Sequence, residues 1–468
     1  MNKEIKRILL LLAGFCIIFI GLIAYMSYFQ IFLAEGIKTN SYNKRLWINE
    51  ENTLRGSIID REGNVLVYSE KKKDSNTRYY KYGSLYSHTI GYSYREYGKA
   101  GLELQYNNTL LDMDENKAIN EFKNIVAPST VGNSLKLTLD HGTQLKAKEL
   151  LKGRKGAIVA MNPLTGEIYA MASLPDFDSS NLKVNWKEIS EDTNSPLLNR
   201  AISGLYTPGS VFKIITTTAA LETVDLNKEY DCTGSTIIDG YTFKDYQGKS
   251  HGHLDLKEAL VHSCNTYFTE KSILIGKSKM QQVSDNYMFN NKIPFDLPVK
   301  ISKTPFKDNL GKTDIAAASI GQGKVVATPL NMALVASAIA NGGEMMKPIL
   351  VKEVLSNSGK VIKSSISETL STVSSSLIAN ELKEMMIEAV KSGTGQNASI
   401  KNVVVAGKTG TAENPSGKSH AWFIGFAPAD NPKISIAVVL EEEGSTGGIS
   451  AAPIARDLII YSLNNLNF

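Results

Sequence analysis

Residues 207–213 read Thr-Pro-Gly-Ser-Val-Phe-Lys, and the mostly apolar stretch Ile-Ile-Thr-Thr-Thr-Ala-Ala follows at 214–220. The proline and glycine predict a turn that leads into a helix over 211–223, with Ser210 at or just inside its start. Because positions three apart share a face of a helix, we expect Lys213 to point back beside the Ser210 hydroxyl. A serine becomes nucleophilic when a nearby base takes its proton, and lysine can be that base once an apolar setting lowers its pKa. Ser-x-x-Lys spacing recurs elsewhere in the chain, so other motifs must support this one.

A second motif lies on a strand predicted near the end of the chain. A β-branched run predicts the strand over 402–412, and its second half contains Lys408, Thr409, Gly410 and Thr411. Glycines on a strand leave its surface bare, so that a substrate can lie along it. We expect the Lys408 ammonium and the hydroxyls of Thr409 and Thr411 to form an edge that binds a carboxylate.

The third motif is Ser263-Cys264-Asn265, which lies within a helical segment predicted over 254–275. A hydroxyl and an amide on a turn between helices could relay a proton and hold a substrate carbonyl. Ser-x-Asn is a common pattern, and residues 284–286, Ser-Asp-Asn, offer a second candidate. We favour 263–265 because it borders an apolar helix, whereas 284–286 leads into a polar loop.

The surrounding pattern predicts an α+β domain built on an antiparallel sheet. Two apolar runs, at 155–161 and 167–172, flank a turn at 162–166, which is typical of a hairpin. Strands at both ends of the region with helices between them predict a sheet covered by a helical subdomain. The other predicted elements are strands at 420–427 and 433–441 and helices at 328–341 and 450–464.

The first thirty residues predict a membrane anchor. Lys3, Lys6 and Arg7 precede an apolar run, and no charged residue falls between Arg7 and Glu35. The run exceeds the roughly 20 residues that span a bilayer, and the basic residues before it predict a cytoplasmic tail (1–7) and an exported remainder. A cleaved signal peptide is the alternative, but this run ends in bulky residues instead of small ones. We therefore expect one transmembrane helix over 8–30, in the cell membrane.

Composition excludes several other classes of protein. The length of 468 residues suits two or three domains, and a scattered net charge of +4 argues against nucleic acid as a partner. A disulfide between Cys232 and Cys264 is possible, but we favour free, buried thiols. His251 and His253 could form a zinc pair, yet the sequence offers no nearby third ligand, so we expect neither a metal nor a cofactor.

The three motifs, in this order, resemble the penicillin-recognising serine transferases, which comprise the penicillin-binding proteins and serine β-lactamases. The resemblance implies that Ser210 attacks the carbonyl of a D-Ala-D-Ala stem peptide of peptidoglycan, with Lys213 as the base. It also implies that Ser263 passes the proton to the leaving D-alanine and that Asn265 holds the peptide. β-Lactam antibiotics would acylate the same serine.

The same resemblance assigns the strand and the oxyanion hole. The carboxylate-binding positions would be Lys408, Thr409, Gly410 and Thr411. Backbone N–H groups of Ser210 and Thr411 would form the oxyanion hole. The implied fold is a penicillin-recognising serine transferase domain, an antiparallel sheet with a helical subdomain.

Two N-terminal stretches narrow the resemblance to class B penicillin-binding proteins. Residues 54–63, Leu-Arg-Gly-Ser-Ile-Ile-Asp-Arg-Glu-Gly, and 101–106, Gly-Leu-Glu-Leu-Gln-Tyr, are similar to that class's pedestal motifs. The resemblance, which is strongest to the compact PbpA-like branch, implies a small, mainly β pedestal (31–145) and a transpeptidase domain (146–468). It implies ion pairs within the pedestal from Arg55, Asp60 and Arg61. It also implies a SEDS-type glycan polymerase in the membrane as a partner.

Other functions of the same superfamily stay open on the residues. A D,D-carboxypeptidase differs only in using water as the acceptor, whereas a β-lactamase would not need a pedestal. A triad hydrolase would use Gly-Lys-Ser-His-Gly at 248–252, but the preceding residues are too polar for the required strand. A non-catalytic cell-wall scaffold has no reason to keep Ser210, Lys213 and Lys408 together.

Overall fold

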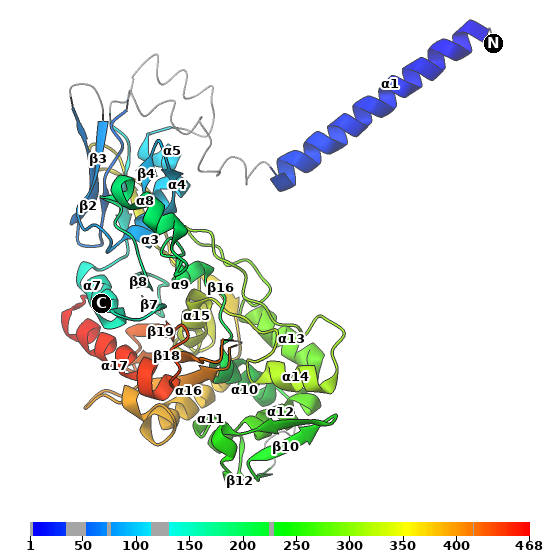
Figure 1. Cartoon of the computed structure of the whole chain (residues 1–468), viewed down its shortest axis with the longest axis vertical. Helices are drawn as coiled ribbons and strands as arrows, with labels where there is room; N and C mark the ends of the chain where they lie inside the picture. Colours follow the sequence, from blue (N-terminus) through cyan, green and yellow to red (C-terminus); the bar gives the residue numbers. More distant parts are fainter. Residues whose placement is uncertain (1–2, 34–52, 73–75, 114–130, 224–228, 415) are drawn as a thin grey trace.

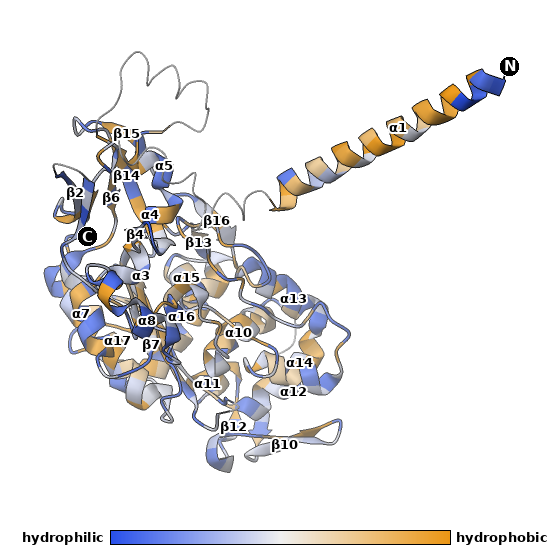
Figure 2. Cartoon of the chain, turned by 45° about the horizontal axis from the view of Figure 1, so that its top comes forward, coloured by the Kyte–Doolittle hydropathy of each residue, from blue (hydrophilic) through white to orange (hydrophobic). Residues whose placement is uncertain are grey.

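The N-terminal helix stands apart in character from the rest of the chain. The computed structural model describes residues 3–33, 53–72, 76–113, 131–223, 229–414 and 416–468, so the remaining parts of the predicted tail and pedestal lie outside it. Helix α1 (Lys3–Tyr28) continues as the π-helical turn η1 (Phe29–Leu33), and none of its residues is buried. Among the described residues this is the one helix long and apolar enough to cross a membrane, and Figure 2 shows that most of its residues are hydrophobic. The run predicted over 8–30 lies within it.

A five-stranded antiparallel sheet forms the centre of the predicted transpeptidase domain (146–468), named the catalytic region from here on (Figure 1). Its order is β17 (Ala406–Ala412), β18 (His420–Ala427), β19 (Ile434–Leu440), β7 (Gly156–Met161) and β8 (Ile168–Leu174). The predicted hairpin and C-terminal strands are confirmed. The strand predicted over 402–412 is wrong at its start, because Asn402 has a φ of +63° and the strand begins at Ala406. The apolar residues before Ala406 belong to the turn instead.

Both faces of this sheet are covered by helices. Alternate side chains of a strand point to opposite faces, and Ile158, Phe423 and Val438 pack with α7 (His141–Leu151) and α17 (Gly447–Asn465). The neighbouring side chains on these strands, such as Val159, Trp422 and Val439, belong to the larger core that contains α15 and the helical subdomain. The doubly covered sheet explains why its central strands are apolar throughout.

Helix α15 (Pro329–Ala340) corresponds to the helix predicted over 328–341, and Thr328 caps it by accepting a hydrogen bond from the backbone N–H of Asn331. The helical subdomain lies beside the sheet and consists of α10 (Lys213–Leu221), α11 (Leu256–Val261), α12 (Asn265–Ile275), α13 (Lys277–Asn286) and α14 (Lys312–Ser319). The helical segment predicted over 254–275 consists of two helices, and the 263–265 motif lies on the turn between them, as expected. The chain breaks between α11 and α12 because Ser263 adopts a φ of +60°, which a continuous helix does not allow.

The pedestal is a six-stranded sheet assembled from two distant parts of the sequence. Its N-terminal strands are β1 (Ile58–Ile59), β2 (Val65–Lys71), β3 (Asn76–Tyr80) and β6 (Ser134–Leu137). A hairpin, β14 (Val351–Leu355) and β15 (Val361–Ser364), completes it through antiparallel pairing of β14 with β6. The predicted domain boundary at 145/146 stays a prediction, and it does not anticipate this hairpin.

A buried charge cluster joins the two pedestal motifs. Glu103, on α4 (Gly101–Gln105), pairs with Arg55 Nε at 2.5 Å and with Arg78 Nε at 2.8 Å. Burial opposes ionisation, but the two guanidinium groups hold the pKa of Glu103 at about 2. The predicted pairing of Arg55 is therefore found. Asp60 instead accepts turn N–H groups, and Arg61 lies over the Tyr169 ring of the catalytic region.

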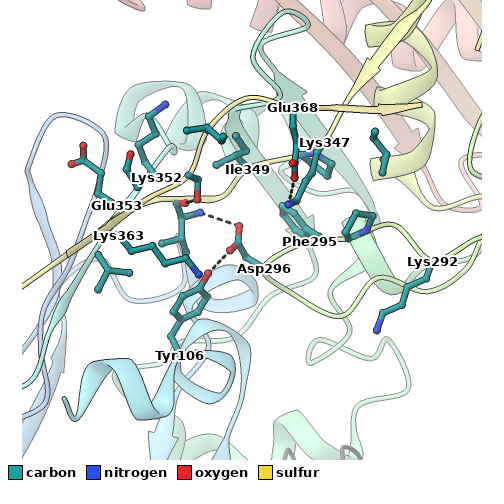
Figure 3. A pocket seen from close by; sticks show the side chains of 18 residues that line it. Tyr106, Lys292, Phe295, Asp296, Lys347, Ile349, Lys352, Glu353, Lys363 and Glu368 are labelled. Carbon is teal, nitrogen blue, oxygen red and sulfur yellow. Dashed lines mark hydrogen bonds and ion pairs between the residues drawn. The ribbon is translucent and has the colours of Figure 1, made fainter. Parts of the chain in front are cut away.

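The pedestal meets the catalytic region around a cavity of about 810 Å³ (Figure 3). Asp296 lies at its centre, where it accepts the Tyr106 hydroxyl and the backbone N–H groups of Leu350 and Val351. Tyr106 belongs to the second pedestal motif, and Leu350 and Val351 lead into β14. This contact therefore ties the pedestal to a loop of the helical subdomain.

Candidate active site

Ser210 lies on a tight turn packed against the edge strand of the central sheet. It belongs to the 3₁₀ helix η3 (Gly209–Phe212), which runs directly into α10. Gly209 has a φ of +57°, and a Cβ at this position would lie 2.7 Å from the carbonyl oxygen of Thr411. Glycine is therefore required for the turn to approach β17 so closely. The half-buried Ser210 starts the helical segment as the sequence predicts.

Lys213 is fully buried one helical turn after Ser210. Its Nζ donates to the backbone carbonyl of Ser263 at 2.7 Å and to Oδ1 of Asn265 at 2.7 Å, and it lies 5.4 Å from the centre of the Phe268 ring. Burial lowers the pKa of Lys213 to about 8. A minority of this amine is therefore neutral near physiological pH.

Ser263 and Asn265 lie on the turn that separates α11 from α12. The Ser263 hydroxyl accepts a hydrogen bond from Lys408 Nζ at 2.9 Å and lies 3.4 Å from Lys213 Nζ. It thus bridges the lysines of the other two motifs. Two hydrogen bonds hold Asn265 in place. Its Nδ2 donates to the Lys244 carbonyl at 2.9 Å, and its backbone N–H donates to Asp245.

The second candidate, Ser284 to Asn286, takes no part in this network. Ser284 is buried within α13, where its hydroxyl donates to the carbonyl of Met280 at 2.7 Å. Its neighbour Asp285 accepts from Gln281 on the same helix. The geometry therefore favours 263–265, as the sequence analysis does.

The motif on β17 divides between the two faces of the strand. Lys408 is fully buried, and burial next to the Lys213 charge holds the pKa of Lys408 well below its ordinary value. The Thr409 hydroxyl is hydrogen-bonded to that of Thr394 at 2.6 Å, and the half-buried Thr411 accepts from the backbone N–H of Gly447 at 3.3 Å. Only Lys408 of these three reaches the Ser263 hydroxyl in the structure.

Two further contacts hold the site together. A Cβ on Gly410 would lie 2.7 Å from the carbonyl oxygen of Pro208, so the bare strand admits the turn that carries Ser210. Trp422 on β18 donates from Nε1 to the carbonyl of Thr207 at 3.0 Å. The structure therefore brings Ser210, Lys213, Ser263, Asn265 and the 408–411 strand into one site.

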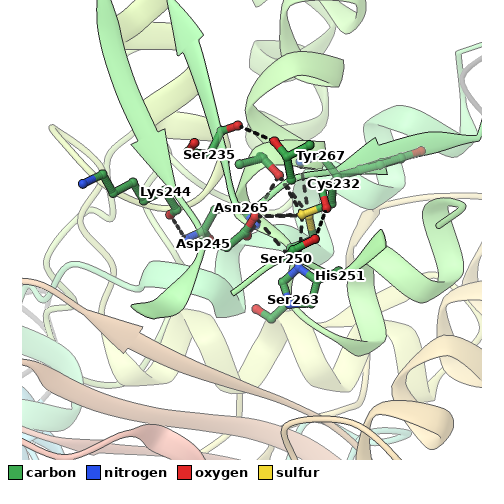
Figure 4. A network of polar contacts seen from close by, with 12 residues as sticks. Cys232, Ser235, Lys244, Asp245, Ser250, His251, Ser263, Asn265 and Tyr267 are labelled. Atoms are coloured by element: carbon green, nitrogen blue, oxygen red, sulfur yellow. Dashed lines mark hydrogen bonds and ion pairs between the residues drawn. The ribbon is translucent and has the colours of Figure 1, made fainter. Parts of the chain in front are cut away.

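A second polar cluster, which the sequence analysis missed, lies behind the Ser263–Asn265 turn (Figure 4). One ligand atom from each of Cys232, Asp245, His251 and Cys264 lies within 4.8 Å of the others. The expectation that His251 lacks a nearby third ligand is wrong, because the fold brings Asp245, Cys264 and Cys232, all within 19 residues of it in the sequence, to its side chain. His253, by contrast, faces Asp231 and Glu229 at the surface. Both Cys232 and Cys264 are free and buried, as predicted.

Two protein-family models match this chain, and both are models of penicillin-binding protein domains. Residues 156–460 match the model of the penicillin-binding protein transpeptidase domain. Residues 55–134 match the model of the penicillin-binding protein A dimerisation domain. The two matches correspond to the catalytic region and to the N-terminal part of the pedestal.

Individual relatives extend this agreement over the full chain. The chain is 31% identical to the peptidoglycan D,D-transpeptidase PbpA of Mycolicibacterium smegmatis over 99% of each protein. It is also 31% identical to the peptidoglycan D,D-transpeptidase MrdA of Acinetobacter baumannii, over 86% of this chain and 69% of MrdA. The penicillin G acyl-enzyme complex of penicillin-binding protein A from M. tuberculosis superposes with a TM-score of 0.81 at 30% identity, covering 88% of this chain and all of the other. The chain belongs to the class B penicillin-binding proteins, the D,D-transpeptidases of peptidoglycan.

Proposed function

We propose that Ser210 is the acylated nucleophile and that Lys213 is the base that takes its proton. The observation that carries this proposal is the position of the buried Lys213 ammonium. Its Nζ donates to the Ser263 carbonyl and to Oδ1 of Asn265, each at 2.7 Å. Burial lowers the pKa of Lys213 to about 8, and a general base works best when its pKa lies near the working pH. By taking the proton of the Ser210 hydroxyl, Lys213 would allow Ser210 to attack the penultimate D-alanine carbonyl of a stem peptide.

The proton would then travel through Ser263. Its hydroxyl lies within 3.4 Å of both Lys213 and Lys408, so it can pass the proton towards the leaving D-alanine. Asn265 would hold the peptide through its amide. The backbone N–H groups of Ser210 and Thr411 would stabilise the oxyanion. The close approach of Gly209 to Thr411 on β17 supports this assignment, because it brings the two backbone segments together.

The terminal carboxylate of the donor peptide would bind along β17. We assign Lys408 to its charge and Gly410 to the close approach of the turn that carries Ser210. Thr411 would supply a hydroxyl. Thr409, whose hydroxyl is bonded to Thr394, would fix the strand in place.

The anchor supports a proposal about orientation and partner. Lys3, Lys6 and Arg7 precede the apolar part of α1, which favours a cytoplasmic N-terminus and an extracytoplasmic catalytic domain. The side chains of α1 are exposed along its length and could pack against the transmembrane helices of a SEDS-type glycan polymerase. Copurification of the two proteins, with and without residues 1–33, tests this partner.

Labelling with a fluorescent penicillin tests the nucleophile. Membranes carrying the wild-type chain or Ser210→Ala are labelled, washed and chased with unlabelled penicillin. We expect a label that requires Ser210 and persists for many minutes. Loss of the label within seconds would indicate β-lactamase turnover, and a folded wild-type protein that takes no label would leave only the scaffold function.

A further inference from the structure

A hairpin of two strands, β10 (Ser235–Ile238) and β11 (Tyr241–Lys244), ends directly beside the active-site turn. Both residues of its connecting turn, 239–240, have positive φ values, +47° and +81°, as the tightest hairpin turns require. Nδ2 of Asn265 donates to the Lys244 carbonyl at 2.9 Å, and Figure 4 shows Lys244 beside Asn265. The end of β11 is therefore in contact with a residue of the candidate active site.

One edge of β11 has no neighbouring strand in the described part of the chain, where β10 and β11 form a two-stranded sheet. In an antiparallel pair, residues that bond across the pair alternate with residues whose N–H and C=O groups point outward. The Asp245 N–H donates to the Gly234 carbonyl across the hairpin at 3.0 Å, so Asp245 belongs to the bonded set. Lys244 and Thr242 therefore belong to the outward set. The contact of the Lys244 carbonyl with Asn265 shows that this edge faces the active-site turn.

The outward groups of Thr242 are available to a ligand. Both Thr242 and Lys244 are exposed, and the backbone N–H and C=O of Thr242 have no hydrogen-bond partner among the described residues. An open strand edge binds an extended peptide by adding it as a further strand through main-chain hydrogen bonds. The exposed Lys244 ammonium on the same strand favours a peptide that carries a carboxylate, as a stem peptide does at its C-terminus.

Two strand edges contact the active-site turn at its opposite ends. The Ser263 hydroxyl accepts from Lys408 on β17, whereas Asn265 donates to Lys244 on β11. The proposed function assigns β17 to the donor peptide, which becomes attached to the enzyme. The edge of β11 is then the strand that remains for a second peptide.

We propose that the outer edge of β11 binds the acceptor stem peptide, an inference that rests on the proposed function of Ser210. In transpeptidation the amine of the acceptor attacks the carbonyl of the Ser210 ester. An amide bond forms, the ester bond breaks, and the Ser210 oxygen takes up the proton that the amine loses. Pairing of the acceptor with Thr242 would hold its amine near the ester and favour transfer over hydrolysis by water.

Transfer from a D-Ala-D-Ala donor to a synthetic stem peptide with a free side-chain amine tests this edge in the full-length chain. Thr242→Pro removes the outward N–H but keeps the bonds across the hairpin, because proline fits an edge strand where its nitrogen faces outward. The acceptor concentration for half-maximal transfer should rise at least about tenfold. Ile237→Pro is the matched control, since Ile237 is the outward residue opposite Thr242 on the other edge of the hairpin, and it should transfer like the wild type.

Hydrogen exchange of the wild-type chain tests the same edge without any substitution. The protein is first acylated by penicillin and then mixed with the synthetic stem peptide. We expect the peptide to slow amide exchange over 241–244 and to leave exchange over 235–238 as it was.

Two results would overturn the acceptor site. One is equal transfer by the two proline variants, and the other is exchange over 241–244 that the peptide does not slow. Wild-type protein that penicillin does not label would instead refute the proposed function of Ser210.

Discussion

Replacing Asn265 by aspartate tests whether the neutral form of Lys213 is the base. The Asn265 amide oxygen accepts from Lys213 Nζ at 2.7 Å, and Lys213 is fully buried. With the pKa of Lys213 at about 8, about 9% of it is neutral at pH 7 and about 91% at pH 9. Acylation of the wild type should therefore rise about tenfold between these two pH values.

Asn265→Asp places a carboxylate where the amide oxygen stood, which stabilises the ammonium. An opposite charge this close raises a lysine pKa by about 1–3 units, and a rise of 2 units leaves about 0.1% of Lys213 neutral at pH 7. Acylation at pH 7 should then fall about 100-fold. The loss should shrink as the pH approaches 10, because the neutral base returns.

The assay is the second-order rate constant of acylation by a fluorescent penicillin, measured by rapid mixing from pH 6 to 10. Asn286→Asp, which changes the second Ser-x-Asn motif in the same way, is the matched control and should leave the profile unchanged. A variant whose inflection stays near pH 8, with only a lower plateau, would refute the reasoning. So would a wild-type profile that is flat between pH 7 and 9.

Three further predictions concern the strand, the turn and the pedestal. Lys408→Ala removes the donor to the Ser263 hydroxyl and should slow penicillin acylation about 100-fold or more, whereas Lys401→Ala, at an exposed position, should not. Gly209→Ala should reduce labelling at least about tenfold because its Cβ meets Thr411, whereas Gly240→Ala, also at positive φ but in open space, should label normally. Glu103→Gln should lower the free energy of unfolding in urea by about 3–5 kcal/mol, because it breaks a buried pair and leaves two guanidinium groups without their carboxylate. Because the folded-state pKa of Glu103 is depressed to about 2, its contribution is present above about pH 4.5 and lost as the pH falls towards 2, and the variant should lack this dependence.

The parts of the site that depend on local spacing were predictable from the sequence. Ser210 and Lys213 are one helical turn apart, so a helix start suffices to place them together. The 408–411 motif required only that its strand lie at the edge of the sheet, where β17 lies. The membrane helix followed from the length and charge of a single run.

The parts that depend on tertiary contacts were not predictable. The motif at 263–265 predicts a turn between helices, but nothing in its residue types indicates the positive φ that Ser263 adopts. The apolar residues before Ala406 predict a strand, although the left-handed Asn402 turns the chain there. The donors near His251 lie 6 to 19 residues from it in the sequence, and only the folded chain shows that they meet in one cluster.

The pairing of β14 with β6 has a consequence for how the protein reaches its folded state. The N-terminal strands are synthesised first, but β6 keeps an open edge until the chain has been made as far as Val351. An open edge invites pairing with other chains, so the newly made pedestal should depend on chaperones to avoid aggregation. Once β14 has paired with β6, backbone hydrogen bonds join the pedestal directly to the catalytic region. A tilt imposed on β1 or β2 would be passed to β14 through backbone hydrogen bonds, and from there along the chain towards α15.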